Sequence, residues 1–360
     1  MRLCTMRFHS TAAVVSAAAA VAACTPEEKP SVSALVLEPA AAIDAPLNFS
    51  NDVALVTNNI ACVVDAYEFQ IRCLTRDGGM VGAFGRKGEG PGEFLAVTRI
   101  ERADDDAVAL LDILLDRITV FSVRGDLLFE TSMPANFSMR QLLGDRVFGI
   151  TRTRTDTGRV DVPTERDLRS GDILWSRNDV AEAAGTDCIA EFAGQMSPSG
   201  SLVYWNCHGQ LVFFEDRDGP GVVRASPGRV EELPNDRDVE AYLEGIARIT
   251  AGAVRAPPAV SEAYADEYRS KPKRWYFSNE GPAFRFDDRG RTWAATTRDR
   301  DERSYIEVWD GPEYLATVEI RDRLMGFDLL GDWLVAHVER EPDRDGIAAR
   351  GIDWYVVPQF

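Results

Sequence analysis

Two aspartates recur at matching places in two stretches of the chain and a third lies close to one of them, and carboxylates placed in this way could hold a calcium ion. Asp65 ends the run IACVVD and Asp112 ends the run AVALLD, with Asp116 four residues further on. Ca²⁺ prefers oxygen ligands, so such carboxylates converging on one channel could serve a calcium-dependent hydrolase of the lactonase or esterase kind. An aspartate that ends a strand also hydrogen-bonds the backbone of the following turn, which is sufficient to explain the recurrence. Turn formation is therefore our main interpretation, and calcium binding is the alternative.

Other catalytic chemistry finds little support in the residue types. After residue 23 the histidines are His208 and His337, whereas a zinc enzyme usually needs several His or Cys ligands. The chain has no G-x-S-x-G elbow, no HExxH pair and no phosphate loop ending in Gly-Lys-Ser/Thr. The sequence therefore predicts no cofactor apart from the calcium alternative and favours a protein that is not an enzyme.

The chain is strongly acidic, with a formal net charge of -18 at pH 7. Residues 1–23 carry Arg2 and Arg7 and no acidic residue, so the chain without them has a charge of -20. Such a surface repels phosphate backbones, and no basic stripe with interleaved aromatic residues interrupts it. We therefore expect no nucleic-acid partner.

The N-terminus has the composition of an export signal that ends at a cysteine. A basic start is followed by an Ala/Val-rich stretch from Thr11 to Ala20 and then by Val21-Ala22-Ala23-Cys24. This order predicts a lipoprotein signal peptide over residues 1–23, its removal, and lipid attachment at Cys24. An ordinary secretory peptide that is cut slightly earlier is the alternative, and both interpretations give export.

Residues 24–47 are predicted to be the tether of this lipid-anchored protein. They are rich in Pro and Ala, with one short apolar run at Val36 and Leu37. The residue directly after Cys24 is Thr25 and not aspartate, which favours the outer membrane. We therefore expect a bacterial cell-envelope protein that faces the periplasm or the exterior. The apolar run could instead return as an outer strand that closes a ring of sheets.

Four cysteines remain for disulfides in an oxidising compartment: Cys62, Cys73, Cys188 and Cys207. Turn signals lie midway between the members of two pairs, at residues 66–69 and at Ser-Pro-Ser-Gly (197–200). Each pair would then face across a hairpin. We predict the disulfides Cys62–Cys73 and Cys188–Cys207, with four free thiols as the less favoured alternative.

The elements that must position these residues are short strands. Residues 71–94 (IRCLTRDGGMVGAFGRKGEGPGEF) consist of an alternating strand, an Asp-Gly-Gly turn, a returning strand and a glycine-rich exit that ends in the apolar Phe94. The same unit recurs along the chain with a period of about 47 residues. Its buried anchors are Ile71, Ile118, Val212, Ile306 and Ile352.

Two slots of this period, near residues 165 and 259, lack an anchor. The first is polar and β-branched, and we expect a degenerate blade with strands at 147–151 and 173–175. In the second, Val239, Tyr242, Leu243, Ile246 and Ile249 recur at helical spacing after Asn235 or Asp236 as the N-cap. A second helix is expected after Pro257-Pro258. A helical insertion at about 235–270 therefore leaves six β blades.

The run GEGPGEF (88–94) and the blade pattern together resemble bacterial NHL-like six-bladed β-propeller lipoproteins. The resemblance covers about residues 48–360 and includes an Asp-x-x-Gly-x-x-Trp strand at 287–293. It implies a triacylated Cys24 and an all-β fold: one six-bladed β-propeller with a short helical insertion. Because propellers gather loops at one mouth, we expect a binding or scaffold module whose partner is an envelope protein or a small-molecule ligand, with the calcium-dependent hydrolase as the alternative.

Overall fold

The computed structural model describes residues 32–45, 52–65, 68–155, 158–186, 194–206, 208–231, 233–236, 238–240, 243, 258–270, 275–277, 283–299, 303–342, 344 and 348–360. The predicted signal peptide, Cys24, Cys188 and Cys207 lie outside these residues. Among the described residues, no helix is both long and apolar enough to cross a membrane.

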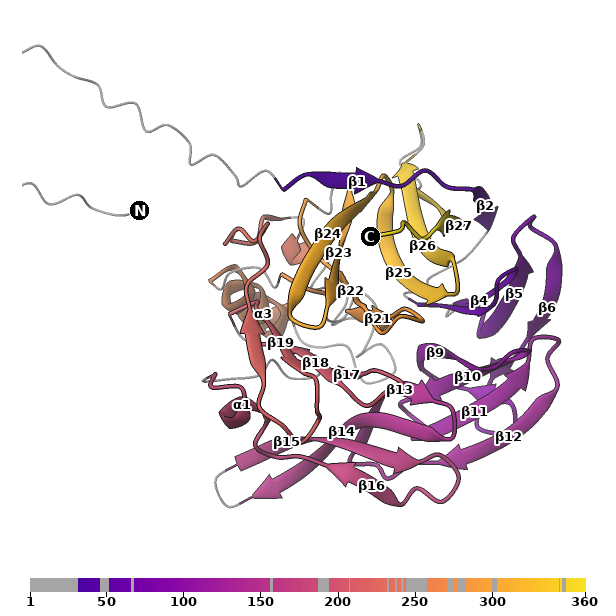
Figure 1. Cartoon of the computed structure of the whole chain (residues 1–360). Helices are drawn as coiled ribbons and strands as arrows, with labels where there is room; N and C mark the ends of the chain where they lie inside the picture. Colours follow the sequence, from indigo (N-terminus) through magenta and orange to yellow (C-terminus); the bar gives the residue numbers. More distant parts are fainter. Residues whose placement is uncertain are drawn as a thin grey trace, which may run out of the picture.

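The described chain is an all-β propeller of six blades around a central axis, as the sequence predicts (Figure 1). The first strands of neighbouring blades contact one another and are therefore the inner strands. The strands, blade by blade, are β3 (Val53–Thr57), β4 (Ile60–Asp65), β5 (Gln70–Thr75), β6 (Met80–Phe84); β9 (Val97–Asp104), β10 (Ala107–Asp112), β11 (Arg117–Ser122), β12 (Leu127–Ser132); β13 (Phe137–Leu143), β14 (Arg146–Thr155), β15 (Gly158–Asp167), β16 (Ile173–Ser176); β17 (Gln195–Met196), β18 (Leu202–Trp205), β19 (Leu211–Phe214), β20 (Val222–Arg224); β21 (Phe284–Phe286), β22 (Thr292–Ala295), β23 (Ser304–Asp310), β24 (Glu313–Ile320); and β25 (Arg323–Leu330), β26 (Trp333–Pro342), β27 (Ala348–Val356) with β2 (Ala41–Ala45).

The core consists of apolar layers between adjacent blades, because each sheet packs both of its faces. The five predicted anchors all lie on the third strand of their blades and are fully buried, which confirms the period. Phe94 ends the short strand β8 (Glu93–Phe94), pairs with β7 (Arg86–Lys87) and is buried between blades 1 and 2. The glycine-rich exit is thus a connection between blades.

The third blade departs from the prediction. Residues 137–176 form a complete four-stranded sheet, and its strands β14 and β15 have ten residues each. The slot near 165 is filled by Glu165, which is buried and forms ion pairs with Arg146 and Arg217 at 2.5 Å each. Because an ion-paired carboxylate occupies the position that is aliphatic in the other blades, this blade does not show the hydrophobic pattern of the repeat. The expectation of a degenerate blade was wrong.

Blade 4 is followed by an insertion, residues 225–283, which includes the range of about 235–270 where the sequence predicts helices. The helix α3 (Pro258–Arg269) begins at the second proline, as expected from a proline at the first helical position. Upstream, the described residues Asp236, Asp238–Glu240 and Leu243 are helical. Asn235 caps them reciprocally: its Oδ1 accepts from the Asp238 amide at 2.9 Å, and Asp238 Oδ2 accepts from the Asn235 amide at 2.8 Å. A shorter helix, α1 (Val180–Ala183), joins blades 3 and 4.

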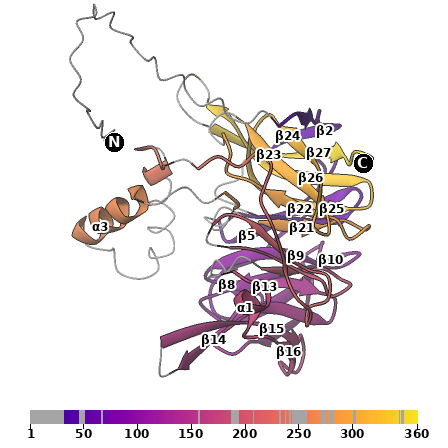
Figure 2. The same ribbon diagram turned by 60° about the vertical axis from the view of Figure 1, so that its left-hand side comes forward.

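All inner strands begin at one face of the ring, which we call the insertion face because residues 225–283 leave from it. The turns between second and third strands lie on this face as well. The hairpin of β14 and β15 extends past the start of β13 and projects from it. Figure 2 shows α3 and this hairpin projecting from the same side of the propeller.

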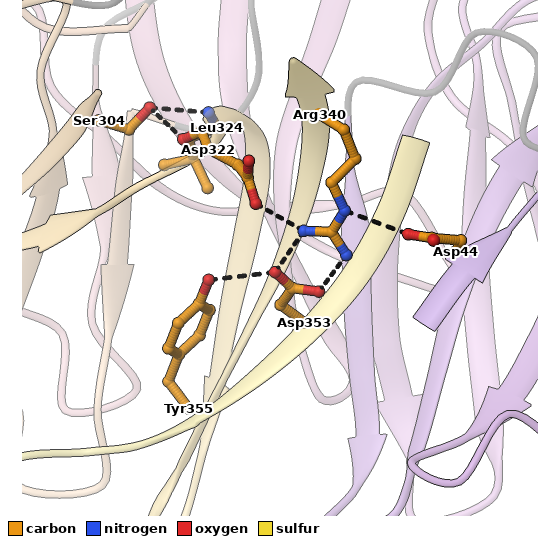
Figure 3. A network of polar contacts seen from close by, with 7 residues as sticks. All are labelled: Asp44, Ser304, Asp322, Leu324, Arg340, Asp353 and Tyr355. Carbon is orange, nitrogen blue, oxygen red and sulfur yellow. Dashed lines mark hydrogen bonds and ion pairs between the residues drawn. The ribbon is translucent and has the colours of Figure 1, made fainter. Parts of the chain in front are cut away.

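The ring closes through strands from the predicted tether. The parallel strand β1 (Ala34–Val36) extends blade 5 along β24, and β2 adds an antiparallel outer strand to β27 in blade 6. Arg340 of β26 locks this closure (Figure 3). Its guanidinium binds Asp44 of β2 at 3.1 Å, Asp322 of the turn before β25 at 2.6 Å, and both oxygens of Asp353 of β27 at 2.7 Å. The segment therefore forms outer strands, as the alternative interpretation expects, but the apolar run at Val36 pairs with blade 5 and it is residues 41–45 that pair with the C-terminal blade.

Candidate functional site

A cluster of buried charges lies on the propeller axis. Arg285 of β21 is its centre, and three carboxylates from three other blades surround the guanidinium: Asp52 at 3.2 Å, Glu101 at 3.3 Å and Asp328 at 3.2 Å. Arg99 of β9 lies 3.9 Å from Asp52. Blades 1, 2, 5 and 6 thus each contribute to what we call the axial cluster: Asp52, Arg99, Glu101, Arg285 and Asp328.

Two of these carboxylates also join neighbouring inner strands through backbone amides. Asp328 Oδ2 accepts from the Leu55 amide of β3 at 2.8 Å. Asp52 accepts from the Val53 amide at 3.0 Å and from the Ile100 amide of β9 at 3.3 Å. The cluster therefore connects blades 6, 1 and 2 at the axis, where the strands meet most closely.

Burial dominates the electrostatics of the cluster. Desolvation raises the pKa of Glu101 to about 7, against the opposing pull of Arg285. Desolvation also raises the pKa of Asp52. For Arg285, burial acts against the charge, but Glu101, Asp52 and Asp328 outweigh it and raise the pKa. The cluster thus keeps opposite charges paired at the axis, with burial opposing the charged form of each carboxylate named here.

The blade-3 side of the axis is basic instead. Arg140 of β13 lies within electrostatic range of Arg99 and Arg152, with Asp161 as the opposing charge. Burial, followed by the two arginines, lowers the pKa of Arg140 to about 9. Arg152 is on the part of β14 that extends past the inner strand. Arg99, Arg140 and Arg152 therefore lie within electrostatic range of one another, with Asp52 and Asp161 as the opposing charges.

The aspartates predicted as calcium candidates lie elsewhere on the insertion face. Asp65 and Asp112 end β4 and β10, which are second strands, so these two carboxylates do not lie on the inner strands that line the axis. Asp65 Oδ1 accepts from the Glu68 amide at 3.0 Å. Asp112 accepts from the amides of Leu95, Ala96, Leu114 and Leu115 at 2.6 to 3.3 Å. These contacts are those expected of a turn-forming aspartate.

Asp116 lies in the same turn as Asp112, in the left-handed region with a φ of 47°. Its carbonyl accepts from the Met133 amide at 2.7 Å. No group of three or more His, Cys, Asp or Glu side chains is arranged to hold a metal ion in the part of the chain that the structure describes.

The cysteines and histidines are placed as follows. Cys62 and Cys73 face each other across β4 and β5 and form the predicted disulfide. The predicted turn at 197–200 joins β17 and β18, but the cysteines 188 and 207 lie outside the described residues. His208 is exposed in the turn after β18, and its amide donates to Asn206 Oδ1 at 3.0 Å. His337 of β26 is fully buried, and burial lowers its pKa to about 3.

A second buried carboxylate fixes the ends of the insertion. Glu307 of β23 accepts from the hydroxyl of Ser226, just after blade 4, and from Trp275 Nε1 at 3.2 Å and Tyr276 OH at 2.9 Å, just before blade 5. Trp309 Nε1 donates to it at 3.2 Å. Both ends of the insertion therefore meet at one side chain on the ring.

None of the axial residues was predicted from the sequence. They come from short strands in which charged and apolar residues alternate, such as Arg99-Ile100-Glu101 and Phe284-Arg285-Phe286. Period-two alternation ordinarily places the charged set in solvent. In a propeller the inner strand presents that set to the axis, and this topological fact is the signal that could have found them.

Comparisons with known proteins bear on the fold alone, and the likeness to one solved structure supports it. No protein-family model and no curated protein matches the chain. Among solved structures, a member of the DUF4221 family from Bacteroides vulgatus superposes with a TM-score of 0.52 at 11% identity and covers 91% of this chain and 99% of its own. A predicted exported protein of Bacteroides fragilis gives 0.49 at 15% identity, with 91% and 95% covered. The WD40 propeller domain of Doa1 gives 0.46 at 7% identity, with 89% and 97% covered.

Proposed function

We propose that this protein is a lipid-anchored binding or scaffold module of the bacterial cell envelope, and that the insertion face is its recognition surface. The observation that carries the proposal is the pair of projections on that face. Blade 4, which lies between them, turns back from β18 to β19 within residues 206–210. The hairpin of blade 3 and the insertion therefore stand on either side of a short blade, as loops that frame a ligand do.

The pairing of the buried charges in the axial cluster supports binding rather than catalysis. Arg285 is surrounded by three carboxylates, and two of those carboxylates also accept backbone amides. Buried charges paired in this way hold strands together, and separating them to admit a substrate would cost several kcal/mol. The residues that remain accessible are those of the turns and projections.

Lipid attachment at Cys24 is part of the proposal and rests on the sequence. The resemblance to NHL-like lipoproteins supports the same address. Nine residues separate Cys24 from β1, so the anchor would keep the rim of blade 5 within about 35 Å of the membrane. Metabolic labelling with a fatty acid should mark the wild type and leave Cys24→Ser unlabelled. Label that persists in the variant would refute the anchor.

The insertion can be removed without opening the ring, which gives the test of the binding surface. Because Ser226 and Trp275 bind one carboxylate, a glycine-serine linker of about six residues can replace residues 228–273. We expect the wild type to capture a defined envelope component and the shortened chain, with an unchanged melting temperature, to lose it. Equal capture by both proteins would contradict the role of the insertion.

A further inference from the structure

The strand β1, which forms the outer edge of blade 5, exposes apolar side chains. Leu35 and Val36 are 47% and 41% exposed, and as neighbours in a strand they point to opposite faces of the sheet. The edge is therefore apolar on both sides. Leu37, the next residue, is buried between blades 5 and 6 and holds β1 against the ring. Of the described apolar clusters on the two sides of blade 5, neither includes Leu35 or Val36, which points to a role outside the fold.

The same rim is almost free of charge, in a chain whose formal net charge is -18. From Val32 to Ile43 the sequence has one ionisable side chain, Glu38. Its carboxylate pairs with Arg321 at 2.5 Å. Figure 1 shows β1 and β2 along the outer rim of blades 5 and 6, so this nearly uncharged stretch borders two neighbouring blades. A surface of this composition has little charge to desolvate when it meets lipid.

The length of the tether indicates what covers this rim. Nine residues separate the predicted lipid attachment at Cys24 from Ala34, the first residue of β1, and they span at most about 35 Å. A lipid-anchored chain therefore keeps the edge of blade 5 nearer to the bilayer than the edge of blade 2, which lies opposite it in the ring of six. Exposed aliphatic side chains beside an acyl anchor add apolar area that is buried at the interface, and this strengthens membrane association.

We propose that the outer edge of blade 5 rests on the lipid bilayer, with Leu35 and Val36 at the boundary between headgroups and acyl chains. This inference rests on the proposed lipid attachment and specifies how the propeller is oriented. The guanidinium of Arg321 lies beside this edge, where a lipid phosphate is within its reach as well. The insertion face is then perpendicular to the bilayer, so α3 and the hairpin of blade 3 stay accessible to a partner (Figure 2).

The test uses the full-length lipidated protein in phosphatidylcholine vesicles, with an environment-sensitive fluorescent amino acid at Ala40. This residue is exposed in the connection between β1 and β2 and lies on the same rim. Brominated phosphatidylcholine quenches a fluorophore only on contact, so it reports whether the rim touches lipid. We expect a blue-shifted emission that the brominated lipid quenches. The variant Leu35→Ser/Val36→Ser should lose the shift and most of the quenching, because the apolar contact that holds the rim at the interface is gone.

The matched control is Leu127→Ser/Leu128→Ser, which removes an apolar pair that is 41% and 52% exposed on the outer strand of blade 2. It should leave the shift and the quenching unchanged. A melting temperature equal to that of the wild type shows that each double variant is folded. Equal losses in both double variants, or no loss in the β1 variant, would overturn the inference.

Two further outcomes concern the wild type. An emission that is blue-shifted but not quenched would show that a second copy or another protein covers the rim, and this would overturn the inference. Fatty-acid labelling of the same preparations separates the two proposals. Labelled protein without quenching refutes the rim contact alone, whereas a wild type without label refutes the anchor and the rim contact together.

Discussion

At the scale of single residues, a few buried charged or polar groups decide how the blades are held together. Arg285 joins its own blade to three others through carboxylates, Arg340 joins the terminal strands, and Glu307 holds both ends of the insertion. Each of these groups is surrounded by partners of complementary charge or by hydrogen-bond donors. His337 is different, because neither of its ring nitrogens has a hydrogen-bond partner among the described residues.

His337 predicts how stability depends on pH. Burial holds its pKa near 3 in the folded chain, against about 6.5 in the unfolded chain, so the unfolded state binds the extra proton between these values. Stability is therefore lost as the pH falls below about 6.5. At pH 4.5 the loss attributable to this residue is about 3 kcal/mol. Urea titrations of wild type and His337→Leu at pH 7.5 and at pH 4.5 give the free energy of unfolding of each protein at each pH. We expect the wild type to lose about 3 kcal/mol more than His337→Leu between the two pH values.

Wild type and His337→Leu must be compared because Glu101 changes the stability with pH in the opposite direction to His337. Its raised pKa makes the folded state bind a proton between about 7 and 4.5, which adds stability as the pH falls through that range. That contribution is common to wild type and variant and cancels in the difference. A His337→Leu protein that loses as much stability on acidification as the wild type would show that His337 is not buried in its neutral form.

At the scale of elements, the connection between blades 1 and 2 depends on a close approach of backbone to ring. Gly85 has a φ of 95°, and a Cβ at this position would lie 2.5 Å from the ring of Phe94 and 3.0 Å from Ile71. Glu93 fixes the following turn by accepting from the Gly90 amide at 2.8 Å and pairing with Arg86 at 2.6 Å. The glycine is therefore required twice, for its backbone angle and for its missing side chain.

Gly85→Ala should consequently lower the free energy of unfolding by about 3 kcal/mol, which combines the cost of a left-handed alanine with that of overpacking. Gly144→Ala is the matched control, because Gly144 has a φ of 64° and no atom within 4 Å of the added Cβ. It should cost about 1 kcal/mol, the backbone contribution alone. Chemical denaturation of both variants provides the measurement, and equal losses would contradict the packing of Phe94 against Gly85.

These strands also show which parts of the fold can be predicted from the sequence. Ile71, Ile118, Val212, Ile306 and Ile352 mark third strands because an aliphatic residue at that place must be buried between two blades. Glu165 occupies such a strand through ion pairs with Arg146 and Arg217, and a hydrophobic pattern cannot anticipate partners nineteen and fifty-two residues away. Asp65 and Asp112 were recognised as turn formers from local chemistry, whereas the axial cluster required knowledge of which strands face the axis.

At the scale of the whole molecule, the propeller is closed by its first and last segments. Asp44 of β2 and Asp353 of β27 both bind Arg340 (Figure 3). The segment predicted mainly as a tether thus contributes outer strands to blades 5 and 6. The closed ring has two faces that are made of turns, and only the insertion face also carries the projecting hairpin and the insertion. Function is assigned to that face because the insertion and the hairpin extend from it (Figure 2).

The most direct test of this assignment is site-specific photo-crosslinking in intact cells. A photoreactive amino acid is placed singly at Glu262 of α3 and at Thr153 of the hairpin, both exposed on the insertion face, and at Asp105, exposed in a turn of the opposite face. We predict that Glu262 and Thr153 yield a discrete adduct with one envelope protein and that Asp105 yields none. An adduct that forms only from Asp105, or equally from all three positions, would contradict the insertion face as the binding surface.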